Sequence, residues 1–495
     1  MIAGRLPQIA ASRSGSGLGW AVSAALLGLL AALLPIEISP VIFAAAGYLL
    51  LAGVTPIAPL AVMLIVAPLR TLFATEVPFQ LPLDIGQLAL ASTVFFALLY
   101  LGTRRLPLPP ILRSPVFAAV LIFVLAAALS GFSAISLSSW FNEWLKWLQI
   151  LVLIAVCLAF AGQAWEWLLI GLIAAGAANA VIGIYQFFGG SGALHLLINE
   201  RFFRAFGTFG QPNPFGAFMG LLTPIALGAA LGYGIRFLRS RRETGTSYWF
   251  YLIPISFHSV AAGLMAVALV MSWSRGAWLG FAAAIGIVIF ALPQRPARSL
   301  LLLASLVIIT ITTWTSGWLP ASITERVGSA VGELVSASDV RGVDITAENY
   351  ALVERVAHWQ AAVNMATAHP WLGVGFGNYE TAYADYRLMN WALALGHAHN
   401  YYLNVFAETG IIGLMAYLLM WLLIIAFTWQ ARRHPDPLAR SVAVGLLGTW
   451  VYLSVHSITD NLYVNNMFLH IGVALGILAV LHQQCSSHGH TMRDA

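Results

Sequence analysis

Long apolar runs fill most of this chain and are separated by short polar segments. A helix needs about 20 mainly apolar residues to cross a bilayer. The pattern therefore predicts twelve to fourteen membrane-spanning helices, the range arising because the second and third candidates are short and close together. The candidates lie at about 19–35, 38–54, 56–73, 85–102, 115–132, 144–161, 165–188, 213–235, 248–272, 276–292, 299–319, 401–430, 438–456 and 464–482.

The composition points to the same class of protein. Apolar residues make up 60% of the chain and charged residues 9%, against about 25% charged residues in soluble domains. That is too little charge to cover a water-facing surface, so we expect an all-α polytopic integral membrane protein. The chain has only two cysteines, Cys157 in an apolar run and Cys485 near the C-terminus, which gives no basis for a disulfide framework or a cysteine metal site. The net charge of +5 gives no reason to expect nucleic acid as a partner.

Arginines in the short loops predict the orientation. They are Arg5, Arg13, Arg104, Arg105, Arg113, Arg236, Arg239, Arg241, Arg242, Arg295, Arg298, Arg432 and Arg433. With fourteen spans all of them fall on one side, which the positive-inside rule makes the cytoplasm. Both termini are then expected to be cytoplasmic. The first span is not expected to be a cleaved signal, since further spans follow it directly.

The same topology divides the chain. We expect N-terminal transmembrane helices over 1–188, a second transmembrane region over 189–482 and a cytoplasmic tail over 483–495. The second region contains one large extracytoplasmic loop, residues 320–400, that is mildly acidic and partly helical. Helical spacing of apolar residues predicts a helix within 347–368. Asn378 is expected to cap a further helix that begins at Tyr379.

Three arginines oppose this orientation: Arg201, Arg204 and Arg275. An arginine at mid-membrane depth costs about 2.5–3.5 kcal/mol on insertion scales, and such residues usually face a cavity or a partner. Guanidinium groups bind phosphate oxygens in pairs, so the three predict a cationic phosphate-binding site at the outer membrane surface. The alternatives are a snorkelling Arg275 and a weak Glu200–Arg204 helical pair.

Two histidines, His397 and His399, stand where the large loop enters the span at 401–430. Such a pair can bind metal, but a zinc site needs a third protein ligand, and no spacing singles one out among His358, His369, Glu380 and Asp385. We therefore expect no metal and consider a general base or a helix-capping histidine. Asp460 could orient a histidine, bind a sugar hydroxyl or belong to a plain loop. Aromatic residues of the loop could stack on sugars or be interface residues; they are Trp371, Tyr379, Tyr383 and Tyr386.

At these residues the chain resembles the O-antigen ligase and polymerase family of multi-span bacterial glycosyltransferases, over roughly residues 180–470. The resemblance rests on the motifs GTFGQPNP after Arg204, SRGA around Arg275, PWLGVG at 370–375, HN at 399–400 and ETG at 408–410. It implies transfer of a glycan from undecaprenyl diphosphate outside the inner membrane, without a cofactor or an essential metal. It also implies that Arg204 and Arg275 hold the diphosphate, that His399 is the base, and that the sugar carbon inverts.

The resemblance leaves the acceptor open. A lipid A–core ligase, an O-antigen or exopolysaccharide polymerase and a protein O-glycan transferase differ only in the acceptor, which is a glycan, lipid A–core or a protein. Arg201, His397 and Asp460 are expected to support the site. A secondary transporter is the alternative of another class, but the two halves show no matching pair of broken helices.

Overall fold

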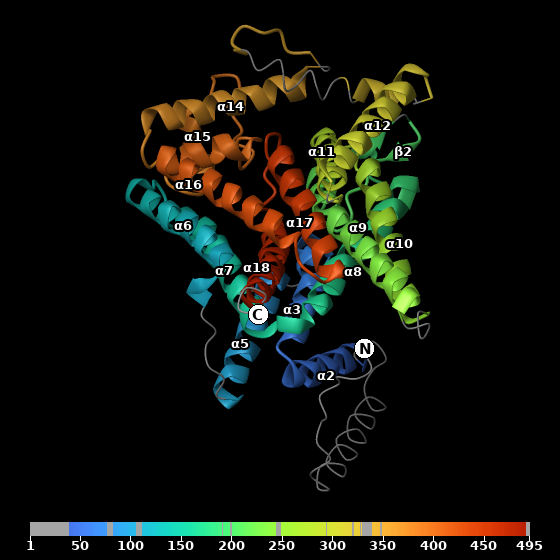
Figure 1. Cartoon of the computed structure of the whole chain (residues 1–495). Coiled ribbons are helices and arrows are strands. Elements are labelled where there is room, and N and C mark those ends of the chain that lie inside the picture. The colour runs from blue at the N-terminus through green and yellow to red at the C-terminus, as the bar shows by residue number, and fades with distance from the viewer. Residues whose placement is uncertain are drawn as a thin grey trace.

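The chain folds into a helical bundle with a smaller helical layer across one end (Figure 1). The computed structural model describes residues 39–491 apart from 77–82, 105–110, 191, 199, 244–248, 294, 319–320, 327, 329–338 and 347–348. Within these residues 11 helices are long and apolar enough to cross a membrane, and two shorter apolar helices span Ala44–Val54 and Arg275–Ala291. These match thirteen predicted spans (11 + 2), and the fourteenth, 19–35, lies outside the described residues. The predicted all-α polytopic membrane fold is confirmed.

The bundle is built in chain order. Its first half contains α2 Ser39–Val54, α3 Ile57–Val66, α4 Arg70–Glu76, α5 Ile85–Arg104, α6 Pro115–Leu129, α7 Leu137–Phe160 and α8 Trp165–Tyr185. A two-stranded antiparallel hairpin follows, β1 Leu197–Ile198 and β2 Phe202–Phe203. The second half contains α9 Pro212–Glu243, α10 Trp249–Met271, α11 Arg275–Ala291, α12 Pro296–Thr315, α14 Tyr350–Ala368, α15 Tyr379–Tyr386, α16 Tyr401–Ala431, α17 Pro437–His456 and α18 Met467–Thr491.

Helices α9 and α17 pack closely at the centre of the bundle, because small residues line both sides of their contact. A Cβ atom added to Gly445 of α17 would lie 2.5 Å from the Pro224 carbonyl oxygen. One added to Gly232 of α9 would lie 2.7 Å from the Cα atom of Leu438. Small residues of this kind let helix backbones approach closely in membranes. A side chain at either glycine would push the two helices apart.

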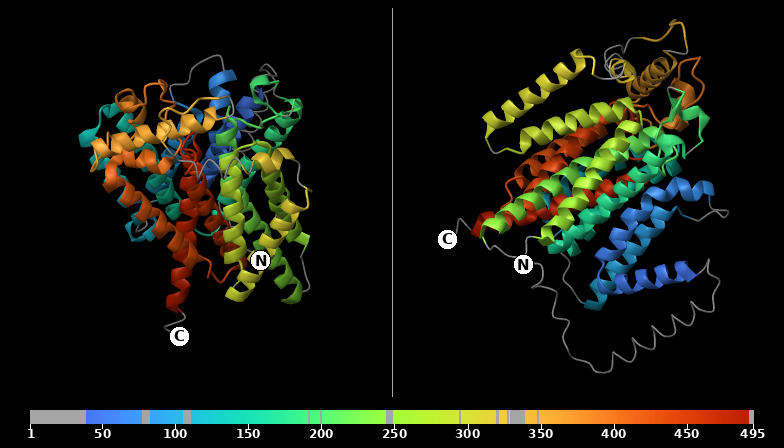
Figure 2. Two further views of the ribbon diagram at one scale, coloured as in Figure 1. Left: turned by 90° about the horizontal axis from the view of Figure 1, so that it is seen from above. Right: turned by 90° about the vertical axis from the view of Figure 1, so that its right-hand side faces the viewer.

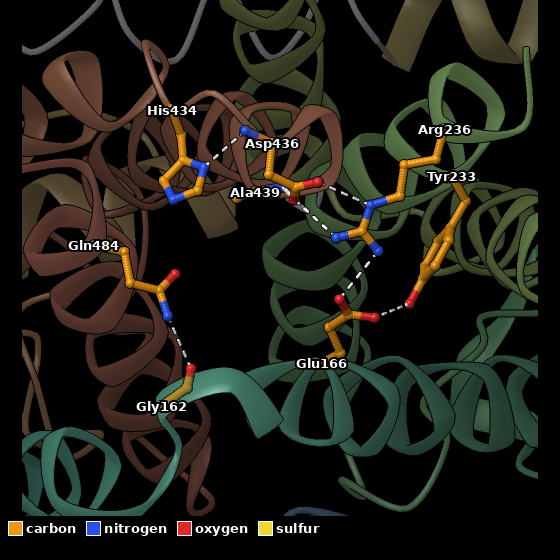
Figure 3. A network of polar contacts seen from close by, with 8 residues as sticks. All are labelled: Gly162, Glu166, Tyr233, Arg236, His434, Asp436, Ala439 and Gln484. Carbon is orange, nitrogen blue, oxygen red and sulfur yellow. Dashed lines mark hydrogen bonds and ion pairs between the residues drawn. The ribbon is translucent and has the colours of Figure 1, made fainter. Parts of the chain in front are cut away.

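A network of hydrogen bonds and ion pairs connects α8, α9 and α17 at one end of the bundle (Figure 3). Arg236 near the end of α9 bonds Glu166 at the start of α8 at 3.0 Å and Asp436 before α17 at 2.8 Å. Tyr233 donates to the same Glu166 carboxylate at 2.7 Å. The predicted span ended at residue 235 with the arginines in a loop, whereas α9 continues to Glu243. The arginines therefore lie on the helix itself, because its backbone need not unwind where it leaves the membrane.

The opposite end carries α14, α15 and their connecting loops, which we call the cap (residues 339–346 and 349–400). Figure 1 and the view from above in Figure 2 show α14 lying across the bundle. The predicted helices in this loop are confirmed, but the predicted side-chain cap by Asn378 is wrong. Its side-chain oxygen instead accepts from the Ser136 N–H at 2.6 Å, while Glu408 of α16 accepts from the Tyr379 N–H at 3.0 Å. The cap is thus joined to the bundle at the start of α15.

Candidate active site

The segment between the hairpin and α9 is held in one tight conformation. Gln186, at the end of α8, accepts from the Gly207 N–H at 2.6 Å and donates to the Gly207 carbonyl at 2.9 Å. The Thr208 hydroxyl donates to Asn179 at 2.7 Å. Gly207 has a φ of +54°, a left-handed conformation that favours glycine. These contacts hold the start of the GTFGQPNP motif in place. Arg204 lies three residues before the motif and is supported by it.

The Arg204 guanidinium is positioned by two hydrogen bonds. Its Nε atom donates to the Ser272 carbonyl at 3.1 Å, and one Nη atom donates to the Asn213 side-chain oxygen at 3.2 Å. Burial, followed by the charges of Arg326, Arg275 and Arg355, lowers the pKa of Arg204 to about 10. The chain therefore gathers several positive charges around a partly buried guanidinium, which is the electrostatic arrangement of an anion-binding site.

Arg275, at the start of α11, and Arg326, in a short helical segment after α12, are the charges nearest in effect to Arg204. Arg275 is the first residue of α11, where the helix dipole adds positive potential and the Ser274 side chain does not cap the helix. Arg326 donates to the Trp273 carbonyl at 3.0 Å. Trp273 itself has a φ of +56°, a sparsely populated conformation for a residue with a side chain. We call Arg204, Arg275, Arg326 and Arg355 the arginine cluster.

Arg201, the third arginine predicted for the phosphate site, is exposed. Its guanidinium carbon lies 5.0 Å from the Phe202 ring centroid. It is not among the charges that shift the pKa of Arg204, so we do not count Arg201 in the arginine cluster.

The two histidines of the cap and Asp460, which follows α17, lie close together. His397 Nε2 lies 3.5 Å from an Asp460 carboxylate oxygen, and the His399 N–H donates to His397 Nδ1 at 3.0 Å. His397 Nδ1 is thus an acceptor, which leaves the ring proton on Nε2, facing the carboxylate. Both nitrogens of His397 are engaged, and Asp460 orients this histidine.

His399 differs from His397 in having an unused ring nitrogen. Its Nδ1 atom is buried and has no hydrogen-bond partner among the described residues. Its φ of +52° is held by a helix start in which Asn400 accepts from the Leu403 N–H at 3.1 Å. Burial, then the neighbouring His397, lowers the pKa of His399, although Asp460 partly opposes this. His399 is therefore neutral at pH 7, the state in which an imidazole accepts a proton.

Two observations relate the histidines to the arginine cluster. Arg355, on α14, lowers the pKa of His399 as well as that of Arg204. Gly276, which follows Arg275, packs against the end of α17, since a Cβ atom there would lie 2.7 Å from His456. Asp460 follows four residues later. The arginine cluster and the histidines are thus near one another, around the starts of α9, α11 and α16 and the end of α17.

The four aromatic residues considered for sugar stacking or for the membrane interface differ in burial. Tyr379 and Tyr383 are fully buried, and Tyr383 stacks on His358 at a centroid distance of 4.8 Å. Tyr386 bonds His369 at 3.0 Å, and Trp371 is exposed. Packing of the cap accounts for the two buried tyrosines.

Sequence reasoning missed Arg326 and Arg355 as members of the cluster. Both lie in the loop 320–400, so they oppose the predicted orientation in the same way as Arg275. An arginine on the predicted extracytoplasmic side could therefore have identified both as candidates. The same criterion would also have selected Arg341, which instead donates to the exposed Asp339 at 2.7 Å.

Residues 260–418 match the sequence model of the O-antigen ligase family. This region is similar to the O-antigen ligase family. It contains Arg275, Arg326, Arg355, His397 and His399. The chain is also 30% identical over 111 residues to an O-antigen ligase of Pseudomonas aeruginosa, a match that covers 22% of this chain and 24% of the relative. The match thus spans about a quarter of that relative's length.

Proposed function

We propose that this protein transfers a glycan from undecaprenyl diphosphate to an acceptor hydroxyl at the outer face of the bacterial inner membrane. The observation that carries the proposal is the proximity of the arginine cluster to His399. Arginines suit a diphosphate, and a neutral histidine suits removal of a hydroxyl proton. We also propose that both termini are cytoplasmic, so that the cap faces the periplasm or the cell exterior.

The chemistry then follows from these charges. The acceptor oxygen attacks the sugar C1 atom, the bond from C1 to the phosphate oxygen breaks, and the diphosphate leaves with the electron pair. The arginine cluster stabilises that leaving charge, so the leaving group needs no proton. His399 takes the acceptor proton and later returns it to water. Attack from the face opposite the diphosphate inverts C1.

A metal is the competing source of positive charge. Ligand atoms of His397, His399 and Asp460 lie within 4.8 Å of one another, so the structure supplies a third candidate ligand that the sequence did not indicate. A metal would have to displace the contacts that already engage both nitrogens of His397. The arginine cluster already offers charge stabilisation. We therefore propose metal-independent transfer.

An assay of carrier release tests this proposal. Purified full-length protein would be given undecaprenyl-diphosphate oligosaccharide together with glycan, lipid A–core or protein acceptors, with and without EDTA. We expect acceptor-dependent release of undecaprenyl diphosphate that survives EDTA, and a product inverted at C1. Release that EDTA abolishes and Zn²⁺ restores would overturn the metal-free mechanism. A retained configuration at C1 would overturn direct displacement.

We propose that the acceptor occupies a cavity of about 330 Å³ in the cap. The Trp359 indole lines it and donates to the His399 carbonyl at 3.4 Å, which places the cavity beside the proposed base. Gln360 also lines it, and its side-chain oxygen is buried without a hydrogen-bond partner among the described residues. An aromatic wall with amide and carboxylate groups is suited to a sugar, and the volume is in the range of small-molecule sites.

Trp359→Ala is expected to raise the acceptor KM about tenfold, equivalent to about 1.4 kcal/mol of lost binding, while donor KM changes little. Steady-state kinetics with each substrate varied in turn would measure this. Trp371→Ala is the matched control, because Trp371 is exposed in the same cap and does not line the cavity. If the two substitutions changed the acceptor KM equally, the proposal that the acceptor binds in this cavity would be wrong.

The pH dependence follows from the lowered pKa of His399. A base is active when neutral, so kcat/KM should fall only below the ordinary histidine value of about 6.5. Asp460 raises the pKa of His399, so Asp460→Asn should move this acidic limb to still lower pH. Glu380→Gln, which removes an exposed carboxylate of the cap, should leave the limb in place. A shift of the limb to higher pH in Asp460→Asn would contradict the assignment.

A further inference from the structure

A second cavity lies at the arginine-rich end of the bundle, remote from the active site. It has a volume of about 590 Å³ between α9, α17, the end of α11 and the turn after α16. Arg239, which lines it, stands 27 residues after the start of α9. At 1.5 Å per residue this is about 40 Å along the helix. No feature of the proposed reaction uses this cavity.

Four arginines line the cavity: Arg239, Arg432, Arg433 and Arg440. No carboxylate lines it among the described residues, and no described ion pair involves any of the four. Arg236, by contrast, is neutralised nearby by Glu166 and Asp436 (Figure 3). Among the residues that the structure describes, the cavity thus holds positive charge without a paired carboxylate, whereas the two carboxylates of the neighbouring network pair with Arg236.

Arg432 is held in place by the protein. Its guanidinium carbon lies 3.6 Å from the centroid of the Trp429 ring, and one Nη atom donates to the Ala291 carbonyl at 3.2 Å. Its Nε–H is buried without a hydrogen-bond partner among the described residues. A pre-oriented guanidinium with an unused donor is suited to an anion such as phosphate.

The walls of the cavity change from apolar to charged along both main helices. Leu231, Ile235 and Arg239 lie at intervals of four residues and so share one face of α9. On α17 the corresponding change runs from Val444 to Arg440. Both helices therefore present apolar side chains toward the middle of the bundle and arginines toward its end. A small soluble anion would use only the charged part of such a cavity.

We propose that this cavity binds the phosphate headgroup of an anionic phospholipid, with its acyl chains along the apolar walls of α9 and α17. Basic pockets between membrane helices have the chemistry that such headgroups require. The four elements around the cavity are the ones whose other ends carry the active site. The bound lipid would therefore stabilise the helix arrangement that positions the arginine cluster and His399. This inference does not depend on the proposed reaction.

Lipid binding by the purified full-length protein tests the inference. The probes are phosphatidylglycerol, neutral phosphatidylcholine and inorganic phosphate, and binding is followed by native mass spectrometry and by thermal unfolding. The pocket variant is Arg239→Gln with Arg440→Gln. The matched control is Arg241→Gln with Arg242→Gln, which removes two charges from the same end of α9 at residues that do not line the cavity. A lysine pair at 239 and 440 retains the charge and reports on folding.

We expect phosphatidylglycerol to bind and to raise the unfolding temperature of the wild type, the control and the lysine variant. The glutamine pocket variant should bind at least about tenfold more weakly, a difference of about 1.4 kcal/mol. If the pocket and control variants lost phosphatidylglycerol binding equally, the binding would depend on general surface charge, and the proposal would be overturned. Equal binding of phosphatidylcholine would also overturn it. Equal stabilisation by inorganic phosphate would indicate a soluble anion as the ligand.

Discussion

His399→Ala is expected to lower kcat for glycan transfer by about 10²–10⁴-fold, the usual contribution of a positioned general base. The reason lies in its environment, since burial keeps the imidazole neutral and its Nδ1 atom has no partner among the described residues. Single-turnover release of undecaprenyl diphosphate would measure the chemical step. His369→Ala is the matched control, because His369 lies in the same cap and is exposed.

His397→Ala should have a smaller effect on kcat and a different signature. Both nitrogens of His397 are engaged, one with Asp460 and one with the backbone of His399. His397 is therefore a positioning residue, and its removal should also raise the pKa of His399, since protonation of His397 at low pH opposes protonation of His399. The acidic limb of kcat/KM would then move to higher pH. If His397→Ala lost most of its kcat while His399→Ala kept wild-type activity, His397 would be the general base and His399 the positioning residue.

The sequence predicted the bundle well because a membrane span leaves a local signal. About 20 apolar residues must follow one another wherever a helix crosses the bilayer, and thirteen of the fourteen predicted spans correspond to described apolar helices. Helix ends were less certain, because α9 carries its arginines on additional turns. The hydropathy pattern predicts where a helix leaves the apolar part of the membrane, but it does not predict the last residue of the helix.

The site could be predicted only in part, because its members come from distant segments. His397 and His399 stand out as a local motif, whereas the contact of His397 with Asp460 depends on how α16 packs against α17. Asn378 shows the same limit. Its type and position suggested a helix cap, but it bonds Ser136, 242 residues away, and Glu408 takes the capping position. The local sequence allowed Asn378 either role, and its tertiary contact with Ser136 determines which one it has.

Arg204→Ala and Arg275→Ala are each expected to lower kcat by about 10²–10³-fold, as loss of a group that stabilises developing charge does. Arg204→Lys should also be severely impaired, because lysine cannot bond both Ser272 and Asn213 while it faces a phosphate. Single-turnover kinetics at saturating donor would measure these losses. Inhibition by inorganic pyrophosphate should weaken in parallel, since the same guanidinium groups would bind it.

Arg201→Ala is the control for this prediction. Arg201 is exposed, lies three residues before Arg204 and places its guanidinium carbon 5.0 Å from the Phe202 ring centroid. We expect it to retain nearly wild-type kcat and pyrophosphate inhibition. If Arg201→Ala matched Arg204→Ala, the relevant property would be the general charge of the segment. If Arg204→Ala raised only the acceptor KM, the cluster would bind the acceptor, and the leaving diphosphate would need another source of stabilisation.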